Sequence, residues 1–247
     1  MERTLINFKL KAFGLLNLII VFLSKIVNMI FHSKLVAVLG ILLFLVSCKS
    51  KKVLSENSLI NKSVVNDTAF VNLKEYSTDF VYDMKYASAD NFLKSKVYDC
   101  AECYLRFKTV IGLMEANKIF IKKGYKIKLF DCYRPLDIQK KMWKIVPNPI
   151  YVANPSKGSI HNRGGAVDIT LVDQNGKELD MGTTFDYFGI EASHNYPNFS
   201  SKIKRNRKLL KRIMIKQKFN SFDSEWWHYN LKSALNDKVS NAKWKCD

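Results

Sequence analysis

Long apolar segments and histidine are both scarce in this chain of 247 residues. A membrane-spanning helix needs about 18 to 20 apolar residues. The two longest apolar runs are shorter, from Phe13 to Leu23 and from Leu35 to Val46. Only four histidines are present, so a metal site with imidazole ligands has few candidates. No internal repeat is visible, which argues against a repeat architecture.

Acidic residues are also scarce, with 22 Asp and Glu against 40 Lys and Arg, and the formal net charge is +18. The first 52 residues carry eight Lys and Arg against one Glu and account for +7 of it. Much of the remainder lies in residues 202–218, where the spacing predicts a helix with a solvated basic face. One side of that helix holds Ile203, Leu210, Ile213, Met214 and Gln217. Attraction to anionic lipid headgroups or to an acidic cell-wall polymer is a second interpretation.

The N-terminal segment has the pattern of a bacterial lipoprotein signal. Lys34 precedes the second apolar run, and Leu45-Val-Ser-Cys48 spans its end, which is typical of a signal whose cysteine is lipidated after cleavage. We therefore expect residues 1–48 to be the signal segment, with Met29 as a candidate true start and Cys48 as the lipidated mature N-terminus. The protein would then be a membrane-anchored lipoprotein of the cell envelope that faces the periplasm. An uncleaved or double-pass anchor is the alternative.

Two further regions follow the signal. Residues 49–72 are rich in Ser, Asn and Lys without sustained periodicity, and they are expected to form a tether. Residues 73–247 suit one catalytic domain with a sizeable core. No nucleic-acid recognition motif accompanies the basic charge, so nucleic acid is not an expected partner of an exported chain.

Four cysteines remain after Cys48, namely Cys100, Cys103, Cys132 and Cys246. In an oxidising periplasm this even count predicts disulfides, but four cysteines allow three pairings and the sequence does not choose among them. A zinc site at Cys100-x-x-Cys103 is the competing interpretation. It lacks the second Cys or His pair that such a site requires.

The pattern of apolar residues predicts the main elements of the catalytic domain. Strands are expected at Asp79 to Tyr86 and at Tyr125 to Phe130, the latter delivering Asp131-Cys-Tyr-Arg134-Pro135 at its end. Helices are expected from Leu105 to Lys123, ending before Gly124, and from Leu136 to Trp143.

The most informative stretch is Ser159-Ile-His-Asn-Arg-Gly-Gly-Ala-Val-Asp168, which Glu225-Trp-Trp-His228 complements downstream. Together they supply two imidazoles and a carboxylate as ligands, and Glu225 as a second carboxylate. Catalytic zinc sites use three such nitrogen and oxygen ligands and leave a position for water, whereas structural sites are closed, commonly by thiolates. His161, Asp168 and His228 therefore predict the catalytic kind, with Glu225 as the base.

The expected local structure supports this interpretation, but it also requires an irregular strand near Trp227. Residues 166–172 alternate as in a strand with Asp168 on one face, and the glycines before it let the chain fold His161 back toward Asp168. Glu225 and His228, however, are three residues apart and would face opposite sides of a regular strand. A bulge or a strand end near Trp227 is required.

Each fragment alone has a simpler interpretation. A histidine beside glycines is usually a loop residue, and the Trp-Trp pair is typical of core aromatics flanked by surface groups. Their combination favours the metal site, because two of the three histidines after His32 fall within these two fragments.

With these motifs the sequence resembles the VanX-type D-alanyl-D-alanine dipeptidases, which are zinc D,D-peptidases of peptidase family M15. The shared pattern Ser-x-His-x-x-Gly-x-Ala-x-Asp is matched from Ser159 to Asp168, and Glu-x-Trp-His is matched from Glu225 to His228. The resemblance runs from about Leu73 to Tyr229. Further matches are Lys85-Tyr-Ala87 with Asn91-Phe92, Asp131-Cys-Tyr-Arg-Pro135 and Met181-Gly-Thr-Thr-Phe-Asp186.

The resemblance implies a fold, a cofactor and residue roles. It implies an α+β domain with a small, mainly antiparallel sheet and packed helices, like that of Hedgehog and the D,D-peptidases, with the zinc cleft on the open side of the sheet. One Zn²⁺ per chain is expected. Arg134 would stabilise the developing oxyanion, Tyr86 and Asp186 would lie near the substrate ammonium, and Ser159 near the polar groups of the bound peptide.

The expected function is hydrolysis of the D-Ala-D-Ala dipeptide in the cell envelope. Asp186 favours a dipeptidase, because a carboxylate paired with a free ammonium penalises longer peptides in which that amine is acylated. Two alternatives remain: a peptidoglycan D,D- or L,D-carboxypeptidase on the same scaffold, and a lipoprotein that only binds cell-wall peptide. The sequence leaves the oligomeric state open.

Overall fold

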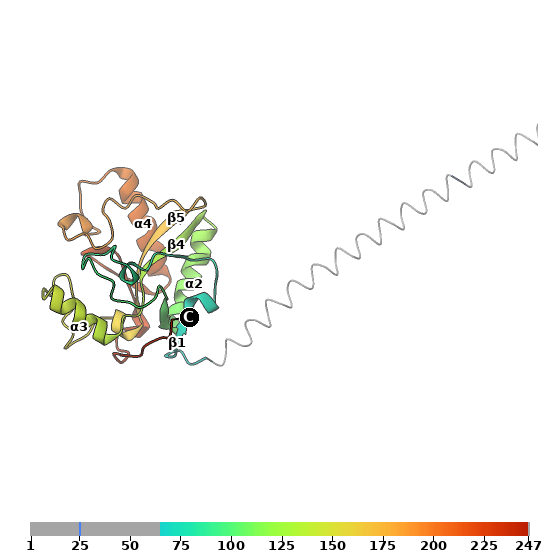
Figure 1. Cartoon of the computed structure of the whole chain (residues 1–247). Helices are drawn as coiled ribbons and strands as arrows, with labels where there is room; N and C mark the ends of the chain where they lie inside the picture. The colour runs from blue at the N-terminus through green and yellow to red at the C-terminus, as the bar shows by residue number, and fades with distance from the viewer. Residues whose placement is uncertain (1–24, 26–64, 247) are drawn as a thin grey trace, which may run out of the picture. The chain divides into compact units, whose positions relative to one another are not determined.

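The computed structural model describes Lys25 and residues 65–246 (Figure 1). The chain divides between Val64 and Val65, and the fold described below belongs to the second unit. Cys48 and most of the expected tether lie outside the described residues. Among the residues that are described, no helix combines the length and apolar character needed to cross a bilayer.

A mixed five-stranded sheet forms the centre of this unit, with the strand order β2-β4-β5-β7-β6. Only the β2–β4 pair is parallel, and every other neighbouring pair is antiparallel. A separate two-stranded sheet pairs β1 with β3. The strands are β1 (Phe70–Asn72), β2 (Val81–Tyr82), β3 (Tyr104–Arg106), β4 (Tyr125–Asp131), β5 (Ala166–Asp173), β6 (Phe219–Phe222) and β7 (Glu225–Leu231). The expected α+β fold with a mainly antiparallel sheet is confirmed.

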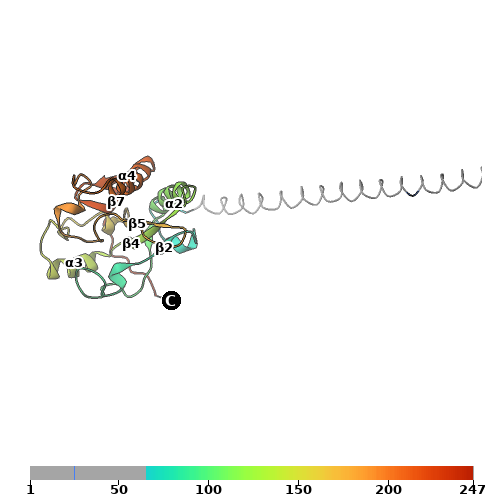
Figure 2. The ribbon, with the colours of Figure 1, turned by 90° about the horizontal axis from the view of Figure 1, so that it is seen from above.

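Helices cover the two sides of the sheet unequally. In Figure 2, α2 (Phe107–Ile121) and α4 (Ser201–Lys216) lie side by side on one face, and α3 (Leu136–Ile145) lies on the opposite side. Ser200 caps α4 by accepting a hydrogen bond from the backbone N–H of Ile203. The short 3₁₀ helices are η2 (Leu73–Glu75), η3 (Lys85–Ala87), η4 (His161–Arg163), η5 (Ile190–Ala192) and η6 (Lys232–Ala234).

Strand β5 separates the core from the candidate site. Its residues 166–172 are all buried, and Val167, Ile169 and Leu171 join the main core cluster with residues of α2 and α4. Because side chains alternate along a strand, Asp168 projects to the other face. The cleft that Asp168 lines also contains Met142 of α3, so the site lies on the side of the sheet away from α2 and α4.

Two sequence expectations about the start of the domain need correction. The predicted strand from Asp79 to Tyr86 is only two residues long, because β2 pairs with β4 at Val81 and Tyr82 alone and the chain then turns into η3. The compact unit also begins at Val65 rather than near Leu73. Strand β1, within the range expected to be tether, is held by its pairing with β3.

The structure selects one of the three possible disulfide pairings. Cys100 is bonded to Cys246, and Cys103 is bonded to Cys132. The two cysteines of the Cys-x-x-Cys pair therefore have different partners, which disagrees with a zinc site there. The first bond ties down the C-terminal segment, and the second joins the start of β3 to the loop that carries Arg134.

Candidate metal centre and active site

Three sequence-predicted ligands converge at the end of the β5–β7 ladder. Asp168 of β5 and His228 of β7 are direct partners across the ladder, and His161 begins η4 just before β5. Nε2 of His161 lies 3.2 Å from Nδ1 of His228 and 3.3 Å from Oδ2 of Asp168. Nδ1 of His228 lies 2.9 Å from Oδ1 of Asp168. The structure thus brings together residues that are 67 positions apart.

Hydrogen bonds on the outer side of each imidazole set the tautomer. Nδ1 of His161 donates to the carbonyl oxygen of Cys132 over 2.7 Å. Nε2 of His228 donates to Oδ1 of Asn230 over 2.9 Å. In each neutral ring the remaining nitrogen carries a lone pair that faces the other imidazole and Asp168. Three electron pairs directed at one small space repel one another unless a cation lies between them, so this donor set fits a metal ion.

Close backbone packing explains the glycines between the first two ligands. Gly164 ends η4 with φ of 70°, in the left-handed region. A Cβ there would lie 2.4 Å from a ring carbon of Phe70, and one at Gly165 would lie 2.4 Å from Cβ of Ala234. Side chains at either position would therefore displace His161 from Asp168.

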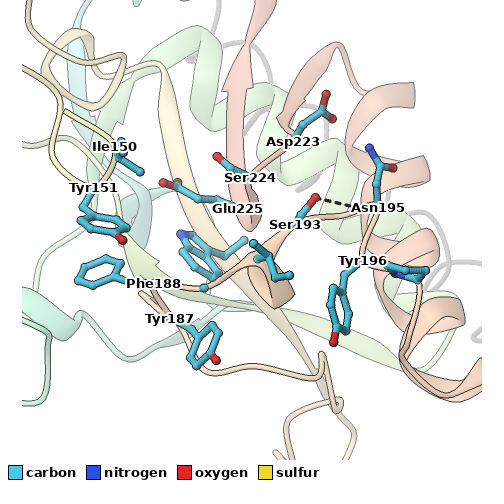
Figure 3. A pocket seen from close by; sticks show the side chains of 14 residues that line it. Ile150, Tyr151, Tyr187, Phe188, Ser193, Asn195, Tyr196, Asp223, Ser224 and Glu225 are labelled. Atoms are coloured by element: carbon cyan, nitrogen blue, oxygen red, sulfur yellow. Dashed lines mark hydrogen bonds between the residues drawn. The ribbon is translucent and has the colours of Figure 1, made fainter. Parts of the chain in front are cut away.

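Glu225 lies on the same cleft as the three ligands. β7 pairs with β5 only from His228 onward, and its pairing with β6 is irregular near Phe222, so the required interruption of the regular strand is present. Oε2 of Glu225 is 3.9 Å from Nδ1 of His228. Burial raises the pKa of the Glu225 carboxyl above its ordinary value. Figure 3 shows this carboxylate at the edge of an adjoining groove.

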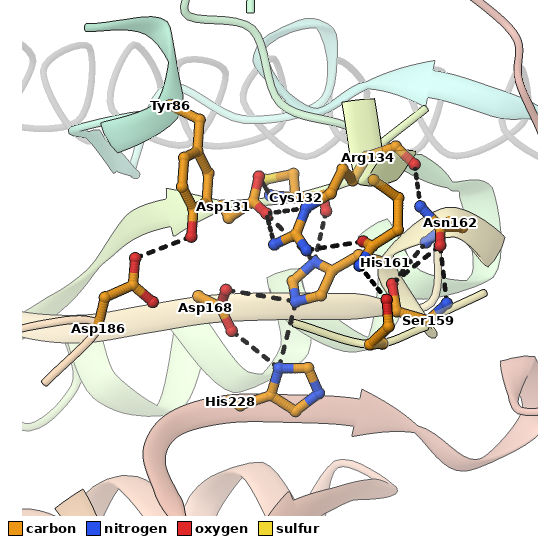
Figure 4. A network of polar contacts seen from close by, with 12 residues as sticks. Tyr86, Asp131, Cys132, Arg134, Ser159, His161, Asn162, Asp168, Asp186 and His228 are labelled. Atoms are coloured by element: carbon orange, nitrogen blue, oxygen red, sulfur yellow. Dashed lines mark hydrogen bonds and ion pairs between the residues drawn. The ribbon is translucent and has the colours of Figure 1, made fainter. Parts of the chain in front are cut away.

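Arg134 is held rigidly beside the cleft. Its Nε and Nη2 donate to Oδ2 of Asp131 over 3.2 and 2.6 Å, and its Nη1 donates to Oε1 of Gln139 over 2.9 Å. Asp131 is fully buried and also accepts a hydrogen bond from Tyr98. A guanidinium has five N–H groups, and these three contacts leave one on each terminal nitrogen for a ligand (Figure 4).

Tyr86 and Asp186 form a second polar pair in the cleft. The Tyr86 hydroxyl donates to Oδ2 of Asp186 over 2.8 Å. Burial, together with the nearby Asp168 carboxylate, raises the pKa of Asp186 well above its usual range. A cation placed beside Asp186 would favour the charged carboxylate, so this corner of the cleft is suited to an ammonium group.

Ser159 lies at the opposite side of the cleft from this pair, next to His161 (Figure 4). Its hydroxyl donates to Oδ1 of Asn162 over 3.2 Å. Asn162 in turn donates to the carbonyl oxygen of Arg134 over 2.7 Å. The serine and the arginine are thereby fixed to the same buried amide. A dipeptide lying between Asp186 and Ser159 would pass the metal ligands.

The structure gives roles to residues to which the sequence assigned none. Asn230 and the Cys132 carbonyl orient the imidazoles, and Asp131, Gln139 and Asn162 hold Arg134 and Ser159. Of these residues, only Asn230 could have been predicted, because it follows His228 by two residues and therefore lies on the same face of the strand. His194 lies elsewhere, against Tyr229 and the basic helix α4.

Every predicted site residue of the described chain lines one cleft of about 220 Å³. Its contents are three side chains that could hold a metal ion, a buried carboxyl of raised pKa, a fixed guanidinium and an acidic corner. This combination suits the hydrolysis of a small peptide with a free N-terminus. The cleft-lining members of the predicted set are Tyr86, Arg134, Ser159, His161, Asp168, Asp186, Glu225 and His228.

Comparisons with known proteins agree with this chemistry. The family model described as D-ala-D-ala dipeptidase, of the M15 peptidases, matches residues 66–245. A D-alanyl-D-alanine dipeptidase of Escherichia coli K12 is 36% identical over 180 residues, covering 72% of this chain and 93% of that protein. One from Enterococcus faecium is 29% identical over 189 residues, covering 67% and 93%. The resemblance is thereby confirmed, and the chain belongs to the D-Ala-D-Ala dipeptidase family of M15 peptidases.

Proposed function

We propose that this peptidase hydrolyses the D-Ala-D-Ala dipeptide to two D-alanine molecules, with one zinc ion bound by His161, Asp168 and His228. The observation that carries the proposal is the placement of these ligands, a carboxylic acid and an acidic corner in one small cleft. The names of the relatives, D-alanyl-D-alanine dipeptidases, support this substrate.

Zinc is the metal that the donor set favours. Two imidazole nitrogens and one carboxylate oxygen are typical ligands of catalytic zinc. When bound, the ion polarises the peptide carbonyl and lowers the pKa of a water molecule to about 7. The chain contributes fixed tautomers, since Cys132 and Asn230 keep both ring lone pairs directed inward.

Glu225 moves the proton in this proposal. Its carboxylate takes a proton from the attacking water and returns it to the amine of the departing D-alanine. Burial raises the pKa of the Glu225 carboxyl, and a higher pKa makes a carboxylate a stronger base toward the attacking water. The 3.9 Å distance to His228 places its oxygen beside the ligands.

Arg134 stabilises the negative charge that develops on the carbonyl oxygen as water attacks. Its two remaining N–H groups are held in place by the bonds to Asp131 and Gln139, so little reorganisation is needed when the charge appears. Removing one preorganised donor of this kind typically costs about 3 to 4 kcal/mol of transition-state stabilisation.

The two ends of the cleft select the length of the substrate. Asp186, supported by Tyr86, binds the free ammonium of the dipeptide, and Ser159 binds polar groups near its carboxylate end. In a longer peptide the amine is acylated and uncharged, so Asp186 would be left buried without a cation. This argument favours a dipeptidase over a carboxypeptidase that acts on the wall peptide.

A parallel assay tests the proposal. The full chain, purified and supplied with zinc, is offered D-Ala-D-Ala and a muramyl pentapeptide that ends in D-Ala-D-Ala. Release of alanine from the dipeptide alone is expected. Release from the pentapeptide alone would indicate a carboxypeptidase, and release from neither would indicate a protein that only binds wall peptide.

We further propose that the protein acts in the cell envelope, anchored through a lipid on Cys48, with residues 49 to 64 as part of the tether. The support is the lipoprotein signal pattern ending at Cys48. Mass spectrometry of the mature N-terminus tests this. A lipidated Cys48 is expected, and an unprocessed Met1 would contradict it.

A further inference from the structure

A large groove adjoins the catalytic cleft on the side of Glu225 and Trp227. Figure 3 shows the side chains that line this groove, with Glu225 among them. It has a volume of about 730 Å³, against about 220 Å³ for the cleft. One wall comes from the segment 187–197 that follows Asp186, and another from the turn between β6 and β7. Its large apolar lining residues include Ile150, Tyr151, Tyr187, Phe188, Ile190 and Trp227.

The groove exposes an unusual amount of apolar surface. Ile150 and Ile190 are 73% and 76% exposed, and Tyr187 and Phe188 are 42% and 41% exposed. These side chains gather around one hollow, and contiguous apolar surface of this kind typically marks a binding site. Among the described lining residues there is no Lys or Arg, so the groove offers no cation to a substrate carboxylate.

The groove and the cleft are continuous. Ile150, Tyr151, Glu225 and Trp227 line both of them. Tyr151 packs against Phe188 with ring centroids 4.2 Å apart, and Phe188 also packs against Phe92 of the cleft, 4.9 Å away. A substrate bound beside Glu225 is therefore within reach of the groove.

D-Ala-D-Ala has no group that would use this space. The two methyl groups of that dipeptide are small, and its charged ends are assigned to Asp186 and Ser159. The remaining occupant is a larger side chain on one of the two substrate residues. Phe188 of the groove packs against Phe92, and Phe92 packs edge-on against Tyr86, the hydrogen-bond partner of Asp186. The residue whose ammonium is bound at Asp186 is therefore the one that the groove adjoins.

We propose that the groove is a side-chain subsite for the N-terminal residue, and that the enzyme cleaves D,D-dipeptides whose first residue is large and apolar. This inference rests on the proposed function, since it takes the ammonium position from it. Because a hydrophobic pocket gains about 10-fold or more in kcat/KM from added methylene groups, D-Leu-D-Ala is expected to exceed D-Ala-D-Leu by about this factor.

The test measures kcat/KM for D-Ala-D-Ala, D-Leu-D-Ala and D-Ala-D-Leu with the zinc-loaded full chain and two variants. Ile190→Asp places a charge in the groove at a side chain that is 76% exposed, so the fold should tolerate it. Ile215→Asp is the matched control, since Ile215 is a 44% exposed isoleucine on α4 and is not among the described groove-lining residues.

Ile190→Asp is expected to lower kcat/KM for D-Leu-D-Ala about tenfold and to leave D-Ala-D-Ala within about twofold, whereas Ile215→Asp changes neither. The inference is overturned if D-Leu-D-Ala is cleaved no better than D-Ala-D-Leu, or if Ile190→Asp affects all dipeptides equally. Cleavage of D-Ala-D-Ala alone would overturn the subsite and keep the proposed function. Cleavage of none would overturn both.

Discussion

Asp168 and His228 are direct partners on the antiparallel strands β5 and β7, and an Asp168 carboxylate oxygen lies 2.9 Å from Nδ1 of His228. This pairing fixes two of the three proposed metal ligands through the backbone hydrogen bonds of the sheet. Of the three, only His161 lies outside the sheet, at the start of η4, and the Cys132 carbonyl holds its ring. The site is therefore formed by the fold itself.

Replacement of a sheet-borne ligand should abolish tight metal binding. His228→Gln removes one of three donors. Loss of a group that only hydrogen-bonds to a metal ligand can lower metal affinity by about 100-fold, so the zinc affinity of this variant is expected to fall by more than that. Competition with a chelator measures it. His194→Gln is the control, because His194 lies against Tyr229 and α4. Equal zinc affinity of His228→Gln and the unaltered chain would contradict the site.

Arg134→Lys tests the role of the guanidinium. A lysine ammonium cannot reproduce the contacts with Asp131 and Gln139 while also presenting donors to the substrate. We expect kcat to fall by about 10² to 10³ with unchanged zinc content. Turnover near that of the unaltered enzyme would remove Arg134 from the reaction.

Asp186→Asn tests how the cleft chooses its substrate length. The amide keeps the size of the side chain and a partner for the Tyr86 hydroxyl, but it removes the charge that pairs with the ammonium. The ratio of kcat/KM for D-Ala-D-Ala to that for its N-acetyl derivative is expected to fall at least about tenfold. An unchanged ratio would show that Asp186 does not bind the free ammonium of the substrate.

Cys103→Ala with Cys132→Ala tests the disulfide behind the metal site. The Cys103–Cys132 bond joins residues 29 positions apart, and loss of a bond that closes a loop of this size costs about 3.6 kcal/mol of unfolding free energy. Zinc affinity should also fall about tenfold, because the Cys132 carbonyl orients His161. Chemical denaturation and chelator competition measure the two effects. In the control, Cys100→Ala with Cys246→Ala, stability should fall while zinc affinity is kept.

His194 gives the fold a pH dependence that is separate from the reaction. Burial, with help from Lys211 and Arg207, lowers the pKa of His194 from 6.5 to about 4. As the pH falls, His194 therefore binds a proton near pH 6.5 in the unfolded chain but only near pH 4 in the folded chain. The free energy of unfolding is therefore highest above pH 6.5 and decreases as the pH falls toward 4. Since the ring is partly exposed, we expect a loss of about 1 to 2 kcal/mol.

Comparison with His194→Gln isolates this effect from that of the carboxyl groups. Unfolding free energies of both proteins are measured from pH 7 to pH 4 by chemical denaturation. The unfolding free energy of the unaltered protein, relative to that of His194→Gln, should fall steadily as the pH is lowered and reach its lowest value at pH 4. A difference independent of pH would contradict the buried neutral imidazole.

The sequence predicts the ligands because their signals are local. Glycine before a strand, alternation around Asp168 and the spacing of Glu225 and His228 all act over a few residues. The group that orients His161 is different, because the Cys132 carbonyl lies 29 residues away in the chain and only the folded chain creates this contact. The same holds for the disulfide pairing and for the groove, which segments far apart in the chain build together.

Helix α4 illustrates the same limit within a correctly predicted element. Its spacing predicts the apolar side, and Leu210, Ile213 and Met214 are indeed buried. Arg207 is buried with them, because its guanidinium donates to the carbonyl oxygens of Met181, Ser193 and Glu191. A pattern of apolar residues cannot indicate a buried arginine whose partners are backbone oxygens of a distant loop.

The most direct test of the account is the turnover of D-Ala-D-Ala by Glu225→Gln at a measured zinc content. The amide keeps the size of the side chain but cannot take a proton. We predict one zinc ion per chain, as in the unaltered enzyme, and a kcat lowered by about 10² to 10⁴. Turnover equal to that of the unaltered enzyme at the same zinc content would contradict the account.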